Sequence, residues 1–279
     1  MGMMVGGLYL EHLSDADLAL LAASGETGAA ARRDPQRIEA MLDSPALFRR
    51  LFNTPGRDPL LQGSPFLIFA VLVHRAIRDL AQASFVEEWV GPRQRVPVFD
   101  VDGLRAFGAD PMRRFFLAEL LASYTHVASG SFLVQTRRGW RRRDFSELDP
   151  VRLIELAELL PGAERSAVYR RLGDLSLFLT GVFPDYAAER LVVERERRRL
   201  ERALAAADRE SAERRDGIWL LETLGRRAYR IAQQAADRRT AMAGVLAEVS
   251  ENFAVARRVL NFITDRYLFP MRRQWFAAG

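Results

Sequence analysis

The chain has 279 residues, of which 49% are hydrophobic and 28% are charged, a composition that excludes a disordered or fibrous protein. It contains no cysteine, which excludes disulfides, thiolate metal sites and thiol nucleophiles. It also contains no lysine, which excludes a lysine-bearing phosphate loop and Schiff-base catalysis.

The basic residues are therefore all arginine, and the net charge at pH 7 is only +5. Guanidinium groups keep their proton to about pH 12, so a high isoelectric point is poor evidence of nucleic-acid binding here, and only local clustering of arginine supports it. The scarcity of lysine, cysteine and asparagine favours a thermostable protein. No signal peptide is recognisable, and the longest apolar run, 65–73, is far shorter than the ~20 residues that cross a bilayer. We expect a soluble cytoplasmic protein without a transmembrane segment.

Capping residues followed by proline mark helix starts in the first half of the chain, although Asp58-Pro59 is equally compatible with a turn. Aspartate or serine accepts a bond from a free backbone N–H, and proline lacks the donor that would otherwise be unpaired. The six pairs are Asp34-Pro35, Ser44-Pro45, Asp58-Pro59, Ser64-Pro65, Asp110-Pro111 and Asp149-Pro150.

The first 63 residues are expected to form short helices. These are predicted over 14–25, 35–42 and 45–52. Ser14 and Asp17 resemble a capping box at the start of the first. The helix that follows Ser64 is apolar on every side for two turns, which predicts a central, buried helix.

The next segment mixes short elements. We predict one or two helical turns over 85–90, an edge strand over 95–99 that contains Pro97, a short helix over 101–107 and a longer helix over 111–128. The apolar face of the last helix is formed by Met112, Phe115, Phe116, Leu120, Tyr124 and Val127.

A β-hairpin is predicted next, with SFLVQT paired to WRRRDF across a loop that contains Gly139. Its tip holds five arginines and a tryptophan. These candidate nucleic-acid or anion-binding residues are Arg137, Arg138, Trp140, Arg141, Arg142 and Arg143.

From residue 65 to 145 the predicted order of elements resembles that of a winged helix-turn-helix. The resemblance is one of topology alone and covers about a third of the chain. It implies that the basic loop lies against phosphates and that the 111–128 helix enters the major groove. The alternative is a solvated hairpin whose arginines pair with nearby carboxylates.

Helices are predicted for most of the remaining chain. We expect them over 150–160, 163–180, 191–210, 211–236 and 238–262. Gly173 is expected to permit a close helix crossing, and the apolar stripe of the last helix predicts a C-terminal antiparallel hairpin or bundle. The tail at 266–276 is expected to pack on this helical body.

A pocket between helices is the competing site. Glu119, Ser123 and His126 fall on one face of the predicted 111–128 helix. The other histidines, His12 and His74, lie on different predicted helices. HExxH, GxGxxG and GxSxG patterns are absent, so we expect no metal and no cofactor.

The sequence thus predicts a mainly α-helical protein with one small hairpin or three-stranded sheet and long C-terminal helices. Its predicted divisions are 1–63, 64–183 and 184–279, unless these form one continuous domain. The favoured function is non-enzymatic: an interaction or regulatory protein that contacts nucleic acid or another polyanion through the hairpin. The alternatives are an enzyme or small-molecule binder with an inter-helical pocket, and a scaffold that forms homo-oligomers through the C-terminal helices.

Overall fold

The computed structural model describes residues 2–23, 34–53, 58–91, 94–136, 139–190, 194–204, 208, 216–235, 241–269 and 275. Within these ranges the protein is mainly α-helical, as predicted. The strands form two separate antiparallel pairs, β1 (Val86–Gly91) with β2 (Gln94–Val98) and β3 (Ser129–Thr136) with β4 (Gly139–Ser146). No helix in the described ranges has both the length and the apolar character needed to cross a membrane.

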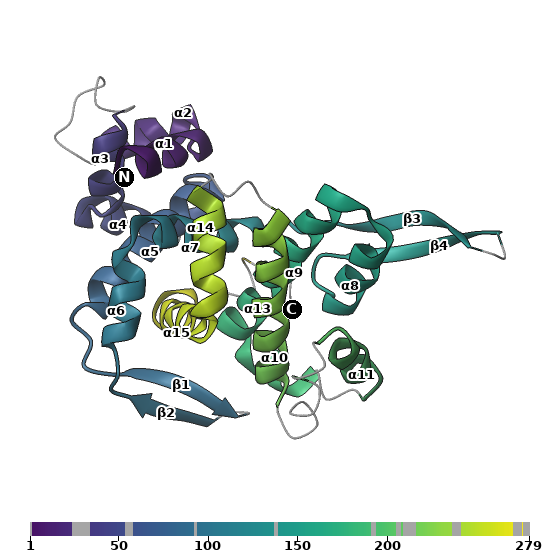
Figure 1. The fold of residues 1–279 in the computed structure, drawn as a ribbon. Coiled ribbons are helices and arrows are strands. Elements are labelled where there is room, and N and C mark those ends of the chain that lie inside the picture. Colours follow the sequence, from purple (N-terminus) through teal and green to yellow (C-terminus); the bar gives the residue numbers. More distant parts are fainter. Residues whose placement is uncertain are drawn as a thin grey trace.

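Four helices form the N-terminal corner of the molecule (Figure 1). They are α1 (Gly2–His12), α2 (Asp15–Ala23), α3 (Pro35–Leu42) and α4 (Pro45–Phe52). The predicted capping box is confirmed, because Ser14 N donates to Asp17 Oδ2 (2.9 Å) and Asp17 N donates to Ser14 Oγ (3.1 Å). The buried Asp17 carboxylate also accepts a hydrogen bond from Ser64 N (2.9 Å). It therefore connects α2 to the start of the helix that begins at Pro65.

All six capping pairs begin a helix, as the sequence predicts, although Asp58 opens only the short 3₁₀ helix η2 (Pro59–Leu61). In five of the six, the side chain of the capping residue accepts a hydrogen bond from a backbone N–H of the first turn. These five are Asp34, Asp58, Ser64, Asp110 and Asp149.

Helix α1 was not predicted, because its glycines and weak amphipathic pattern give little helical signal. It forms because Val5 and Tyr9 are buried against the rest of the core. A Cβ atom at Gly6 would lie only 1.8 Å from the Pro35 carbonyl oxygen, so glycine is what lets α1 approach α3 this closely.

Two helices lie at the centre of the N-terminal half. The first, α5 (Pro65–Leu80), is the predicted central helix, and its residues 66–74 are all buried. It packs on α7 (Pro111–Ser123), which follows the short helix α6 (Asp102–Ala109). The predicted core face of α7 is confirmed as far as Tyr124.

The prediction of helical turns over 85–90 is wrong, because this segment is strand β1. It pairs with β2, in which Pro97 lies opposite Glu87. Local sequence does not reveal this pairing, which depends on the second strand and on a buried anchor. Glu88 supplies that anchor through ion pairs with Arg257 (2.9 Å) and Arg258 (2.8 Å).

The winged-helix arrangement is not formed by the described residues. It requires the strand at 95–99 to join the basic hairpin in one sheet, but β2 pairs with β1 instead. Helix α7 ends at Ser123, before the predicted residue 128, and most of its surface is buried. Its polar side chains are used inside the molecule, since Arg113 pairs with Glu248 (2.8 Å) and Glu119 with Arg170 (2.9 Å). The helix therefore presents no surface that could enter a DNA groove.

The remaining helices complete the body of the molecule (Figure 1). They are α8 (Pro150–Leu159), α9 (Gly162–Val182), α10 (Pro184–Arg190), α11 (Glu194–Arg202), α13 (Gly217–Ala235), α14 (Ala241–Glu251) and α15 (Phe253–Ile263), followed by the π-helical turn η3 (Thr264–Leu268). Helices α9 and α13 are antiparallel, because Ser166 contacts Ala232 near one end and Asp174 contacts Tyr229 further along. Gly173 permits this close crossing, as predicted.

The C-terminal helices are shorter than the sequence indicates. Within the helix predicted over 191–210, the described helix α11 ends at Arg202. The helix predicted over 238–262 is broken at Asn252, whose backbone leaves the helical conformation. The break directs Phe253 into the core beside Gly225. In the described part of the tail, Trp275 packs on the body as expected, since it is buried and its Nε1 donates to Asp58 (3.1 Å).

Candidate functional site

The hairpin β3–β4 projects from the body farther than any other labelled element (Figure 1). Its strands pair without a bulge from Ser129↔Ser146 to Thr136↔Gly139. Gly139 has a φ of 103°, a value that favours glycine and suits a tight turn. Of the predicted tip residues, Arg137 and Arg138 lie outside the described part of the chain, as does the side chain of Arg143.

The base of the hairpin is fixed to the helical body. Glu147 Oε2 accepts from Ala128 N (2.9 Å) and from Arg171 Nη2 (3.1 Å). Arg171 Nη1 in turn donates to Ser123 Oγ at the end of α7 (2.7 Å). These bonds connect the hairpin to α7 and α9, so the ribbon leaves the body from a fixed base.

One face of the hairpin combines apolar and basic side chains. Residues directly opposite each other in an antiparallel pair point to the same face, and the register places Leu133 opposite Arg142 and Trp140 opposite Gln135. Leu133 is 65% exposed and Trp140 is 67% exposed. Two large apolar side chains therefore stand in solvent beside a guanidinium.

The described arginines of the tip are weakly neutralised. Arg142 approaches Asp144 at 3.8 Å, but both side chains are 75% exposed, so water screens this pair. Arg141 is also exposed and has no ion pair with any described residue. Arg142 thus has one weak carboxylate partner and Arg141 has none among the described residues, and the solvated hairpin stays a prediction.

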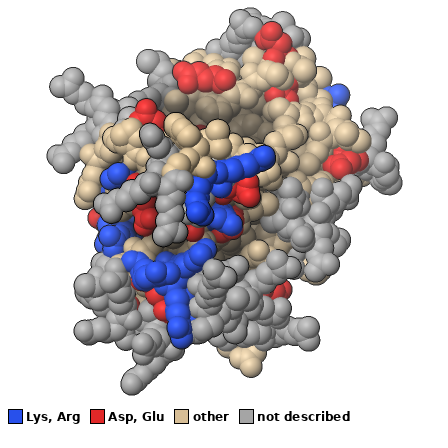
Figure 2. Space-filling view, turned by 90° about the vertical axis from the view of Figure 1, so that its right-hand side faces the viewer, with Lys and Arg blue, Asp and Glu red and all other residues tan. Residues whose placement is uncertain are grey.

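The surface beside the hairpin is also rich in arginine. Figure 2 views the molecule from the side that carries the hairpin, and arginine side chains gather toward the middle and lower part of this face. Among the described residues, Arg141 and Arg142 of β4 and Arg198 and Arg202 of α11 are exposed.

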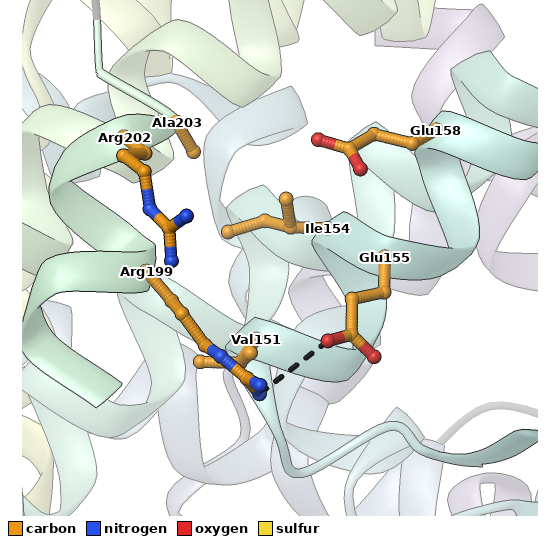
Figure 3. Close-up of a pocket in the computed structure, with 7 residues that line it drawn as sticks. All are labelled: Val151, Ile154, Glu155, Glu158, Arg199, Arg202 and Ala203. Carbon is orange, nitrogen blue, oxygen red and sulfur yellow. Dashed lines mark ion pairs between the residues drawn. The ribbon is translucent and has the colours of Figure 1, made fainter. Parts of the chain in front are cut away.

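Between α8 and α11 lies a cavity of about 300 Å³ (Figure 3). Arg199 and Arg202 of α11 face Glu155 and Glu158 of α8, above an apolar floor that includes Ile154. Arg199 Nη1 lies 3.4 Å from Glu155 Oε1. Two guanidiniums opposite two carboxylates leave the cavity without a net charge, so it does not itself select an anion.

The residues predicted for an inter-helical pocket separate into two groups. Glu119 and Ser123 line a cavity of about 260 Å³ between α7 and α9. His126 lies beyond the end of α7, in an exposed turn where its Nδ1 contacts Thr125 Oγ1 (3.0 Å). The spacing that placed it on the same face does not apply, because the helix has already ended.

Two arginines of α9 complete this cavity. Arg170 Nη2 donates to Glu119 Oε2 (2.9 Å), and Arg171 donates to the Ser123 hydroxyl. The Ser123 hydroxyl also donates to the Leu120 carbonyl (2.8 Å), so it is fully hydrogen-bonded and is not poised as a nucleophile. No pattern within α9 indicates these partners, because Arg170 and Arg171 meet Glu119 and Ser123 only where α9 packs beside α7.

Asp174 lies at the bottom of the same cavity and is 8% exposed. It accepts a hydrogen bond from the Tyr229 hydroxyl (2.8 Å), and Arg170 Nε lies 3.8 Å away. Burial raises the pKa of Asp174 to about 6, although Arg170 and the Tyr229 hydrogen bond oppose this. The carboxyl group therefore gains or loses a proton near neutral pH, and its contacts are all internal.

An aromatic stack closes this region. Tyr124 lies on Phe178 with ring centroids 4.1 Å apart, and the Arg171 guanidinium covers its other face at 3.9 Å. Burial raises the pKa of Tyr124, so its hydroxyl stays protonated. Arg171 thus joins the hairpin base, the end of α7 and this stack.

The described residues contain no group of three or more side chains that could hold a metal ion. No family model, curated protein or solved structure matches this chain.

Proposed function

We propose that the protein binds nucleic acid through the hairpin β3–β4. The binding surface, called here the hairpin surface, comprises Leu133, Trp140 and Arg142 on one face of the ribbon and Arg141, opposite Val134, on the other face. The observation that carries the proposal is the exposure of Trp140 beside arginines that no carboxylate neutralises closely. An exposed apolar side chain such as that of Trp140 is typical of a site that a binding partner covers. Guanidinium groups without close internal partners are able to hydrogen-bond to phosphates.

Nucleic acid fits this surface better than a purely ionic polymer. A polyanion such as heparin meets the arginines but offers no aromatic ring for Trp140. A nucleic acid offers both phosphates and bases, and stacking on an aromatic side chain contributes about 1–3 kcal/mol per base. The mixture of Trp140, Leu133 and arginine on one ribbon therefore favours nucleic acid.

The shape of the hairpin narrows the choice further. The major groove of B-form DNA admits a two-stranded ribbon, and single strands expose their bases for stacking. The major groove of duplex RNA is too narrow for side chains to read. We therefore expect duplex RNA to bind more weakly than DNA of the same length.

The experiment is a fluorescence-anisotropy titration at low salt with labelled duplex DNA, single-stranded DNA and duplex RNA. The test variant replaces Arg141 and Arg142 with alanine. The control replaces Arg37 and Arg49 with alanine, which removes the same charge as the test variant. These exposed arginines lie on α3 and α4, on the side of the molecule away from the hairpin (Figure 1). We expect the test variant to bind at least about tenfold more weakly and to reduce the salt slope by about two.

A third variant, Trp140→Ala, separates stacking from charge. It should weaken binding of single-stranded DNA by about 1–3 kcal/mol and leave heparin binding unchanged. Absence of binding to every nucleic acid at low salt contradicts the proposal, as does an equal loss in the control and the test variant.

The oligomeric scaffold receives no support from the feature on which it was predicted. Val245, Val249, Phe253, Ala256 and Leu260 of the apolar stripe are buried within this molecule. Homo-oligomerisation through the C-terminal helices stays a prediction, which light scattering would test.

A further inference from the structure

A third cavity lies between α3, α5, α6 and α7, with a volume of about 560 Å³. This volume is within the ~300–1,000 Å³ typical of small-molecule sites. Most of the surface that lines it is apolar. The lining includes the apolar residues Ala40, Ile77, Ala81 and Ala109.

The wall of this cavity includes a histidine that is only 5% exposed, His74. Its Nε2 is 3.2 Å from the Tyr9 hydroxyl, and no described atom hydrogen-bonds to its Nδ1. Burial, together with the charges of Arg114 and Arg78, lowers the pKa of His74 to about 3, so the imidazole is neutral at physiological pH. With Tyr9 donating to Nε2, the proton of the imidazole is on Nδ1, which is then a donor without a partner.

The guanidinium groups around His74 also keep unused donors. Arg114 pairs with Glu39 (2.8 Å), yet its Nε is buried without a hydrogen-bond partner. Arg78 pairs with Asp43 through a single nitrogen, Nη2. Each of these two ion pairs joins one positive and one negative charge, so neither adds net charge to the cavity lining.

Arg105 adds positive charge to this lining. Its carboxylate partner, Asp102 (2.8 Å), has an 89% exposed side chain and lies outside the cavity. The lining therefore holds three guanidiniums but only two carboxylates, Glu39 and Asp43. The excess favours an anionic group over a cationic one inside the cavity.

We propose that this cavity binds a small amphipathic carboxylate. The apolar body of the ligand packs on Ile77 and the alanines of the wall. Its carboxylate accepts hydrogen bonds from His74 Nδ1–H and from the free edge of the Arg78 guanidinium. The proposal is independent of the hairpin surface, because it uses different residues on different helices.

The test uses decanoate as the probe and follows the imidazole signals of the full-length protein by ¹⁵N NMR. The chain has three histidines, and His12 and His126 do not line the cavity, so they serve as internal references. We expect saturable shifts of the His74 signals alone. Decylammonium, which has the same length and the opposite charge, should bind at least about tenfold more weakly.

A matched pair of variants locates the site. Ala109→Phe fills the cavity from an exposed position on α6, whereas Ala106→Phe places the same ring at an exposed position of the same helix outside the lining. We expect Ala109→Phe to weaken decanoate binding at least about tenfold and Ala106→Phe to leave it unchanged. The proposal is overturned by absent or non-saturating His74 shifts, by equal binding of decylammonium, or by full binding in the Ala109→Phe variant. Urea unfolding of both variants establishes that each is folded.

Discussion

Two buried titratable residues, His74 and Asp174, change the stability of the folded state with pH in opposite directions. His74 is held neutral by burial, with its pKa lowered from 6.5 to about 3. Asp174 is also favoured in its neutral form, with its pKa raised from 3.8 to about 6. As pH rises from about 4 to about 6, the His74 contribution to stability increases and the Asp174 contribution decreases. The unfolding curve of the native protein therefore shows only the difference between the two.

Replacement of His74 by glutamine separates these effects. Below pH 6.5 the His74 side chain binds a proton in the unfolded chain but not in the folded protein. The native protein therefore loses stability as the pH falls toward the pKa of the folded state. We expect the stability of the native protein relative to His74→Gln to fall by about 2 kcal/mol between about pH 7.5 and about pH 5. Urea unfolding at several pH values measures this difference.

The same comparison for His126 provides the control. That histidine is exposed, so His126→Gln measures the effect of a histidine-to-glutamine substitution at a position outside the core. A pH-independent difference between the native protein and His74→Gln would show that His74 is accessible to protons in the folded state.

At the scale of elements, helix packing depends on positions that have no side chain. A Cβ at Gly173 of α9 would lie 2.6 Å from the ring of Tyr229. That ring cannot move freely, because Asp174 binds its hydroxyl and Phe116 and Phe253 contact its faces and edges. The antiparallel crossing of α9 and α13 therefore requires glycine at this position.

A pair of glycine-to-alanine variants tests this requirement. Gly173→Ala should destabilise the protein by about 1–3 kcal/mol through the clash with Tyr229. Gly244→Ala, at an exposed position of α14 with no atom within 4 Å of the added Cβ, should stabilise it by about 0.5–1 kcal/mol through helix propensity. Thermal unfolding followed by circular dichroism gives both values, and stabilisation by both variants would contradict the close crossing.

At the scale of the whole molecule, a buried ionic cluster joins segments that are far apart in sequence. Arg257 of α15 is 6% exposed at its side chain and contacts Glu88 of β1 (2.9 Å) and Glu222 of α13 (3.4 Å). Burial alone raises the pKa of Glu88, but hydrogen bonds from Arg258 and Arg257 outweigh it and hold the pKa below its usual range. These ion pairs hold the β1–β2 strand pair against α15.

Glu88→Gln removes one charge from this cluster while it keeps the size of the side chain. We expect a loss of at least about 2 kcal/mol, because Arg257 remains buried with weaker compensation. The neighbouring Glu87 has a 52% exposed side chain and pairs only with the surface residue Arg95, so Glu87→Gln should cost less than about 0.5 kcal/mol. Chemical denaturation compares the two, and equal effects would show that the cluster does not stabilise the fold.

The sequence by itself determined the features that depend on near neighbours along the chain. Capping residues before proline located six helix starts, the all-round apolar run of α5 identified a central helix, and alternation with Gly139 identified the hairpin β3–β4. Each of these rests on backbone chemistry or on side-chain spacing within one element. The two described arginine side chains of the predicted tip, Arg141 and Arg142, are exposed.

Only the tertiary structure decided the features that depend on distant partners. Strand β1 forms because β2 and Arg257 hold it, and α1 forms because Gly6 fits against Pro35. Arg170 and Arg171 meet Glu119 and Ser123 because α9 packs beside α7, which no local pattern indicates. The cavity around His74 likewise draws its walls from four helices. Contacts between residues far apart in sequence are set by how complete elements pack, and their energies override local propensity wherever that propensity is weak.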